Sequence, residues 1–503
     1  MHRLYGIETE YGIVVDGLTA SDWIAESIAV VRAYDGKSVS GWNYRGEDPR
    51  RDMRGFIVNR LSVNPDDAKF DSPGVRPLTR EEERSDRVLV NGARLYNDHG
   101  HPEYATPECA DLRSLVAHDK AGERIVHQAA KTRSEQRGST VTLYKNNTDY
   151  HGSSYGTHEA YLMLRAPETE NLIAGLLPFF VSRPLYAGAG KCGVENDKSV
   201  SGDLFQLSQR ADYFSVEASV DTLHNRPIFN TRDEPHATPS QYRRLHVICG
   251  DANMSEFANA LKVGATALAI RLLEDGLTPP VRLSDSVRAA RTVSRDVTLR
   301  ATIEQVGGPP VTALEIQWLY QKEADRRYRG SDSDTDWTLD AWSSTLAAIE
   351  ADPTSLYDKL DWAAKYRIFT EFRLENGLAW SDPHMQSLDL AYHDVDPDQG
   401  LYYGLVQAGE MQTLVTEAHI AHAAVSPPAE TRAWIRGMFV DRFGSSVRSI
   451  GWNGVAFRHL GEDLLFDMNP LVDSGVCLLN DEFNSADTLD RVVEIVRSTK
   501  TSN

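Results

Sequence analysis

The strand-like runs of this 503-residue chain recur without the regular alternation with helices that a parallel sheet requires. Four such runs are IETEYGI from Ile7, RVLVNGARLYND from Arg87, TVTLYKNNTD from Thr140 and YRRLHVICGD from Tyr242. The second run contains Asn91-Gly92, a strong signal for a tight turn between antiparallel strands. The sequence therefore predicts an α+β fold in which a mostly antiparallel sheet is backed by helices.

Helical spacing of apolar residues predicts helices over residues 22–34 and 112–136. A further long helix can be capped by either Asn253 or Ser255 and ended by Gly276.

The chain from about residue 281 to residue 425 is also rich in helical patterns, which Pro427-Pro428 interrupts. Short strands and a final amphipathic helix follow. We therefore expect a large domain over residues 1–425 and a small C-terminal domain over residues 426–503.

Residues 44–87 form a long polar segment with many charged residues and few apolar ones. An ordered connection of this length is unusual inside a compact domain, so we predict a mobile loop with a function. The run GAGKCG at residues 188–193 lacks the spacing of a P-loop, and we expect it to be a flexible turn.

The formal charge of −20 argues against general binding to nucleic acid or to anionic membranes, because both require a basic face. The first residues contain no apolar signal segment, and no apolar stretch approaches the roughly 20 residues that span a bilayer. We therefore expect a cytoplasmic protein. Four scattered cysteines form no C-x-x-C pair and are predicted to be reduced and partly buried: Cys109, Cys192, Cys249 and Cys477.

Glu8 and Glu10 lie one residue apart in the first strand-like run, so their side chains share one face of the strand. This pattern has two interpretations. Both acids can face water, or both can converge on a divalent cation such as Mg²⁺, which prefers oxygen ligands. The motif alone allows either.

Three other stretches offer further groups for such a site. Residues 91–109 place Arg94, Tyr96 and Asp98 on one face of a strand, in a run crowded with ionisable groups. His158 follows a turn rich in glycine and serine, and Arg244 shares a strand face with His246. Together they supply the acids, imidazoles and guanidinium groups that a magnesium-nucleotide site requires.

These stretches resemble the Pup ligase and Pup deamidase family of actinobacteria. The resemblance rests on GIETEYGI, NGARLYNDHGHPEYATPEC, LYKNN, GSSYGTHEAYLM, LSQRADY, NTRDEPHA, YRRLHVICGDANMSE and GWNGVAF. It implies a glutamine synthetase-like fold of the carboxylate-amine ligase type.

The family contains two opposed activities that act on Pup, a small acidic tag protein. The ligase joins the C-terminal glutamate of Pup to lysines, whereas the deamidase converts a C-terminal glutamine of Pup to glutamate and removes Pup from lysines. The long loop at 44–87 and the spacing from Asp98 to Pro102 resemble the deamidase. We therefore expect the hydrolase, with the ligase as the alternative. A nucleotide-dependent Pup-binding protein without catalysis is a third possibility.

The resemblance also implies roles for individual residues. Asp98 resembles the catalytic aspartate, which either attacks the amide carbonyl directly or activates water as a base. Six residues resemble Mg²⁺ ligands, with the tyrosine and the third glutamate expected beside Glu8 and both histidines beside Glu10. They are Glu8, Glu10, Tyr96, Glu103, His158 and His246.

The remaining implied roles concern ligands. Arg210 and Arg232 are expected to bind substrate, the latter through the terminal carboxylate of Pup. ATP is expected to be bound with Mg²⁺ as a cofactor and not consumed stoichiometrically. We expect a monomer whose partners are Pup and pupylated proteins of a proteasomal degradation pathway. The expected nucleotide contacts are Gly6, Ile7, Thr9, Arg94, Thr106, Pro107, Ala160, Arg244 and Trp452.

Overall fold

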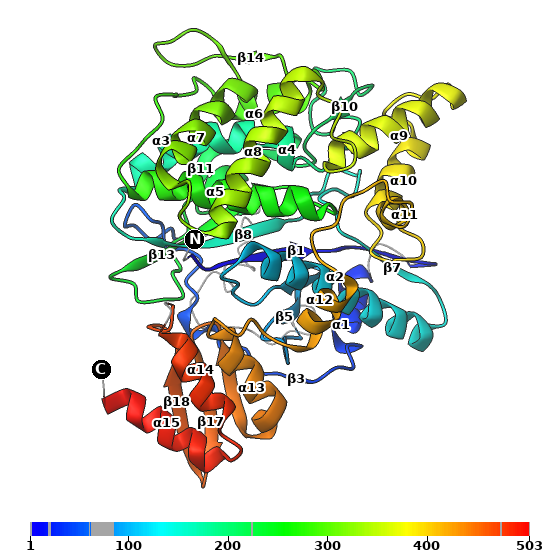
Figure 1. Cartoon of the computed structure of the whole chain (residues 1–503). Helices are drawn as coiled ribbons and strands as arrows, with labels where there is room; N and C mark the ends of the chain where they lie inside the picture. Colours follow the sequence, from blue (N-terminus) through cyan, green and yellow to red (C-terminus); the bar gives the residue numbers. More distant parts are fainter. Residues whose placement is uncertain are drawn as a thin grey trace.

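A seven-stranded sheet in which every neighbouring pair is antiparallel organises the computed structural model of the chain (Figure 1). The structure describes residues 3–18, 22–59, 61, 85–222, 225–472 and 475–501. The predicted α+β class with a mostly antiparallel sheet is confirmed. In spatial order the strands are β13 (Tyr242–Gly250), β8 (Thr157–Leu164), β1 (Tyr5–Glu10), β6 (His101–Ala105), β5 (Arg94–Asp98), β4 (Arg87–Leu89) and β3 (Ser38–Val39).

One face of this sheet is covered by helices. Alternate residues of β1, such as Tyr5 and Ile7, are buried in the main hydrophobic core together with α3, α5, α7 and α8, which Figure 1 shows in one group beside β8. At the other end of the sheet, Leu95 and Tyr104 pack with α1 and α2. The opposite face is therefore left for polar side chains. These helices are α1 (Trp23–Arg32), α2 (Leu112–Arg137), α3 (Thr169–Ser182), α5 (Glu256–Glu274), α7 (Ala313–Tyr328) and α8 (Ser333–Ala351).

The helices predicted from apolar spacing are present. Ser255, one of the two possible caps, accepts a hydrogen bond from the Ala258 backbone and begins α5. The region from 281 to 425 is helical, as expected. The remaining helices up to residue 425 are α4 (Pro184–Ala187), α6 (Ser286–Ser294), α9 (Asp361–Asn376), α10 (Pro383–Tyr392), α11 (Leu401–Gln407) and α12 (Glu417–Val425).

Two tight turns join three of the central strands. Asn91-Gly92 lies between β4 and β5, as predicted, with Gly92 at φ 77°. His99 and Gly100 form the two-residue turn between β5 and β6, at φ 47° and 88°. Positive φ at both central residues defines a type I′ turn, whose twist matches that of the flanking strands. This turn fixes Asp98 at the end of β5, directly opposite His101.

The chain beyond Pro428 folds around a three-stranded antiparallel sheet and its own apolar cluster, in orange to red in Figure 1. That cluster also contains Trp42 and Val88, so the last part of the chain shares its core with two early segments. The division at residue 425 stays a prediction. The elements of this C-terminal unit are α13 (Ala433–Phe443), η4 (Gly444–Ser446), β16 (Val447–Gly451), β17 (Gly454–His459), β18 (Glu462–Asp467), α14 (Val476–Asn484) and α15 (Leu489–Thr501).

Short elements complete the described chain. The small strand pairs are antiparallel except for β11 and β12, which are parallel. These elements are β2 (Gly12–Val15), β7 (Val141–Tyr144), β9 (Lys191–Cys192), β10 (Phe205–Gln206), β11 (Val216–Ser219), β12 (Pro227–Asn230), β14 (Thr302–Ile303), β15 (Val311–Thr312), η1 (Tyr44–Gly46) and η3 (Ala211–Tyr213).

The predicted mobile loop at 44–87 lies mostly outside the described residues, since 60 and 62–84 are not described. Its beginning is anchored: Met53 is buried, and Asp52 forms a β-bridge with Arg232.

The prediction of a flexible turn at residues 188–193 is wrong. Lys191 is fully buried and pairs with Glu195 and Asp212 at 2.8 and 3.0 Å, which holds the segment in place.

All four cysteines are free thiols, three of them buried, as predicted. Among the described residues, no helix combines the length and apolar character needed to cross a membrane.

Candidate active site

The sheet face without helices carries the ionisable residues that the sequence motifs supplied. Alternation places Glu8 and Glu10 on this face, because Ile7 and Thr9 are buried on the other. Strand register then decides which side chains meet. Glu8 lies opposite His158 in the pairing of β1 with β8, and Glu10 lies opposite Glu103 in the pairing of β1 with β6.

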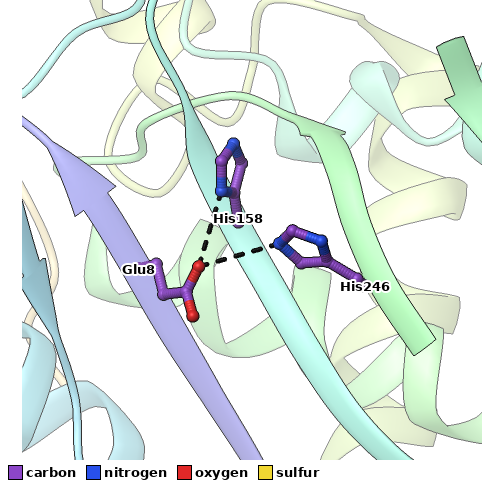
Figure 2. A group of neighbouring side chains, drawn as sticks. All are labelled: Glu8, His158 and His246. Atoms are coloured by element: carbon purple, nitrogen blue, oxygen red, sulfur yellow. Dashed lines mark ion pairs between the residues drawn. The ribbon is translucent and has the colours of Figure 1, made fainter. Parts of the chain in front are cut away.

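Glu8, His158 and His246 form the first of two ligand-like groups, on three adjacent strands (Figure 2). The Glu8 Oε2 atom is 3.5 Å from His158 Nδ1 and 3.7 Å from His246 Nε2. Burial by itself raises the pKa of Glu8, but the two histidines outweigh it and hold that pKa well below its usual range. Burial, followed by the charge of Arg244, lowers the pKa of His246 to about 3. The first group therefore combines a carboxylate with a neutral imidazole.

Glu10, Asp98 and Glu103 form the second group, with one oxygen from each residue within 4.8 Å of the others. The hydroxyl of Tyr96 donates a hydrogen bond of 2.6 Å to Glu103. Burial and the charges of Asp98 and Glu10 raise the pKa of Glu103 well above its usual range. Such crowding of carboxyl groups is unfavourable unless a proton or a cation compensates it.

The grouping reverses the one implied by the family resemblance. Both histidines lie beside Glu8, not Glu10, while Tyr96 and Glu103 lie beside Glu10, not Glu8. The reason is the register: His158 stands opposite Glu8 and Glu103 opposite Glu10, while His246 and Tyr96 come from the next strand on each side. His158 Nε2 does reach within 3.9 Å of Glu10, so the two groups adjoin.

Both groups fit divalent cations by their chemistry. Neither ring nitrogen of His246 has a hydrogen-bond partner within the described residues, although the residue is buried. The Glu103 Oε2 atom is also buried without a hydrogen-bond partner in the same part of the chain. Carboxylate, phenol and imidazole groups with open coordination positions are suitable ligands for Mg²⁺ or Mn²⁺.

An open cavity with a mostly apolar lining lies beside Glu8. Of the nine residues expected to contact nucleotide, six line this cavity, including Trp452 of the C-terminal unit. They are Gly6, Ile7, Thr106, Ala160, Arg244 and Trp452.

Three expected nucleotide contacts do not line the cavity. Thr9 points to the helix-covered face and is 1% exposed. Arg94 forms an ion pair with Asp86 at 2.5 Å, and its guanidinium lies 4.1 Å from the centre of the Trp42 ring. Pro107 lies just outside the lining residues, next to Thr106.

The cavity also contains an ion-pair cluster that the motifs did not identify. Glu108 accepts hydrogen bonds from Arg432 and Arg436. Burial alone would raise the pKa of Glu108, but these two cations outweigh burial and lower that pKa to about 2. Arg432 and His236 line the cavity as well. His236 has φ 48°, an uncommon conformation for a residue other than glycine. Glu108 lies within a quoted motif, but nothing in the sequence links it to the distant arginines.

The two arginines expected to bind substrate differ in burial and in their contacts. Arg210 is buried and donates to Ser154 Oγ and to the Tyr155 carbonyl, while its Nε atom has no hydrogen-bond partner among the described residues. Arg232 is half-buried and lies 3.9 Å from Glu234. Burial, together with Arg226, lowers the pKa of Arg210 to about 10.

Comparisons with known proteins agree over most of the chain. The model of the family described as Pup-ligase protein matches residues 3–456. A depupylase of Acidothermus cellulolyticus is 44% identical over 478 residues, covering 92% of this chain and 93% of that protein. A Pup deamidase/depupylase of Mycolicibacterium smegmatis is 40% identical, with the same two coverages of 92% and 93%. A Pup–protein ligase of Acidimicrobium ferrooxidans is 45% identical but covers 71% of this chain and 80% of that protein.

Two solved structures share the fold. The complex between Pup and its ligase PafA has a TM-score of 0.76 at 31% identity, covering 97% of this chain and 94% of that chain. PafA in complex with ADP has a TM-score of 0.72 at 31% identity, covering 89% of this chain and 96% of that chain. This likeness confirms the glutamine synthetase-like fold expected from the motifs. The chain therefore belongs to the Pup-ligase protein family.

Proposed function

We propose that this chain is a Pup deamidase and depupylase. It hydrolyses the side-chain amide of a C-terminal glutamine in Pup and the isopeptide bond between Pup and a lysine. The observation that carries this proposal is coverage in sequence: relatives named for depupylation or deamidation match 92% of the chain, whereas three Pup–protein ligases match 71%, 74% and 82%.

Asp98 is the proposed catalytic residue. It stands at the end of β5, where the type I′ turn holds it against Glu10 and Glu103. As a nucleophile it would attack the amide carbonyl, expel ammonia or the lysine amine, and leave an anhydride that water hydrolyses. As a base it would take a proton from water, whose oxygen then attacks the same carbonyl. Both roles require the carboxylate form of Asp98.

The two ligand-like groups would hold Mg²⁺. The first is completed by Glu8, His158 and His246, and the second by Glu10 and Glu103 with Tyr96. A bound cation there would offset the crowded carboxylates and favour negative charge developing on the substrate oxygen. We assign ATP to the cavity beside Glu8, bound but not consumed, in keeping with the ADP complex of the neighbour PafA.

Arg210 and Arg232 would bind the acidic end of Pup. Arg210 is preorganised by its contacts with Ser154 and Tyr155, and its free Nε–H can still donate to a carboxylate. The proposal also includes action as a monomer in the cytoplasm, on free Pup and on pupylated proteins.

Mass spectrometry tests this function directly. Purified chain, ATP and Mg²⁺ are incubated with Pup ending in glutamine, and separately with a pupylated protein. We expect release of ammonia with the mass increase of replacing NH₂ by OH, and release of unmodified target protein in the second reaction. Intact Pup and intact conjugate after long incubation would contradict the proposal.

Ligation is the second candidate, because the family description and both solved neighbours refer to Pup ligases. Incubation with Pup ending in glutamate, ATP and a lysine-bearing target protein distinguishes the two. A ligase forms the conjugate with release of ADP, whereas the proposed hydrolase leaves target and ATP unchanged.

A further inference from the structure

His101 belongs to the motif from Asp98 to Pro102 and has no role in the function proposed above. It is the cross-strand partner of Asp98 on the far side of the two-residue turn. Its imidazole stacks on Tyr155, with ring centres 4.5 Å apart and planes at 28°. The ring of Trp23, at the start of α1, lies 5.6 Å away at 57°. Two aromatic rings from other elements therefore contact this histidine.

These two aromatic rings are themselves held in place. The Tyr155 hydroxyl donates to Asn146 Oδ1 and lies 3.2 Å from the Thr148 carbonyl. Trp23 fills the space above the turn so closely that a Cβ atom on Gly100 would stand 2.1 Å from its ring. Packing against fixed neighbours leaves the His101 ring little rotational freedom.

The fixed imidazole points at a proposed metal ligand. His101 Nδ1 is buried, has no hydrogen-bond partner within the described residues, and lies 3.9 Å from Glu10 Oε2. The other oxygen of Glu10 is 3.9 Å from His158 Nε2. The Glu10 carboxylate thus lies between two imidazoles, one at each oxygen.

We propose that His101 is a positioning residue that fixes the orientation of the Glu10 carboxylate relative to Asp98. With its proton on Nδ1, the ring attracts one oxygen of Glu10, and the strand pairing places His101 directly opposite Asp98. A Glu10 carboxylate that is free to rotate would not keep a fixed position beside Asp98. Misplacement of an active-site group in this way costs about 100-fold in rate. The kinetic part of this inference rests on the proposed hydrolysis.

Three substitutions separate the donor from the bulk of the ring. Asparagine places an amide N–H near the position of Nδ1, glutamine places it near Nε2, and alanine removes it. We expect His101→Ala and His101→Gln to lower kcat for Pup deamidation about 100-fold and His101→Asn about tenfold or less, with the KM for Pup unchanged. His384→Asn, at an 81% exposed side chain in α10, is the matched control and should leave both constants unchanged.

Cation binding supplies a readout that does not depend on turnover. Calorimetric titration of the full chain with Mn²⁺ should show affinity weakened about tenfold or more in His101→Ala and His101→Gln, and retained in His101→Asn. If the wild-type chain does not hydrolyse Pup, the proposed function fails and this titration alone decides the role of His101.

Three results would overturn the inference. One is a kcat and Mn²⁺ affinity of His101→Ala equal to those of wild type. Another is an equal loss in the asparagine and glutamine variants, which would indicate that only ring packing matters. The third is a rise in the KM for Pup with kcat unchanged, which would place His101 in substrate binding. If the His101→Ala chain does not fold, the asparagine and glutamine variants are compared instead. A difference between them in kcat and Mn²⁺ affinity supports the inference, and no difference overturns it.

Discussion

At the scale of single residues, Asp98 is the side chain on which the proposed hydrolysis depends most directly. We expect Asp98→Asn to lower kcat for Pup deamidation by a factor on the order of 10³, because an amide is neither a base nor a nucleophile for this step. ATP binding, measured by calorimetry, should be unchanged, since Asp98 does not line the cavity. Asp16→Asn, at an exposed acid after β2, controls for the loss of one negative charge. A variant at position 98 with the wild-type rate would remove Asp98 from the mechanism.

Glu108 gives a prediction for stability against pH. Its pKa falls from an ordinary 4.5 to about 2 in the fold because Arg436 and Arg432 outweigh burial. The stabilisation is therefore fully present above about pH 4.5 and is lost as pH falls towards 2. Glu108→Gln should lower the free energy of unfolding at pH 7 by about 3 kcal/mol.

Urea denaturation of both proteins between pH 3 and pH 7 measures this effect. The difference between wild type and Glu108→Gln should shrink as the pH falls through that interval. A difference that is independent of pH would show that the carboxylate charge is not what the two arginines require. Glu417→Gln, which removes an exposed partner of Arg124, should have little effect at any pH.

At the scale of elements, the turn between β5 and β6 is the most constrained piece of the site. Gly100→Ala should destabilise the chain by about 2 kcal/mol or more, because φ is 88° and the added Cβ would meet Trp23. Gly138, at the end of α2, also has positive φ (75°) but open space around it, so Gly138→Ala should cost about 1 kcal/mol. Thermal unfolding of both variants measures the difference. Equal shifts in Tm would show that Trp23 does not restrict the turn.

Two features of the strands could be predicted from short stretches of sequence alone. Alternation in IETEYGI predicted that Glu8 and Glu10 share a face, and Asn91-Gly92 predicted a turn between paired strands; both are present. The structure places the two histidines beside Glu8 and not beside Glu10, and this placement depends on how β1, β8 and β13 are aligned. Register is a property of two strands together, and neither strand contains it alone.

At the scale of the whole molecule, the cavity depends on both ends of the chain. Trp452→Ala should weaken ATP binding about tenfold, as expected for loss of one stacking surface beside a nucleotide base. Calorimetric titration with ATP measures this, and Mn²⁺ affinity at the acidic groups should be unchanged. Trp318→Ala, at a half-buried tryptophan of α7 away from the cavity, is the control. Unaltered ATP affinity in the Trp452 variant would place the nucleotide elsewhere.

The contribution of the C-terminal unit could be predicted only in part. The motif GWNG pointed to Trp452, but Arg432 and Arg436 reach Glu108 across 324 and 328 positions of sequence, without any motif of their own. Local periodicity also does not predict that Trp42 and Val88 share one apolar cluster with the last helices. Contacts of this kind follow from packing of whole units, which no short window of sequence contains.

The cavity wall joins residues near the start of the chain, such as Leu4 and Glu8, to Trp452 and Val472 near its end. A chain still attached to the ribosome has the early strands long before it has this wall. The cavity therefore cannot be completed during translation until Val472 has left the exit tunnel, and a ligand that needs the whole wall cannot bind before then.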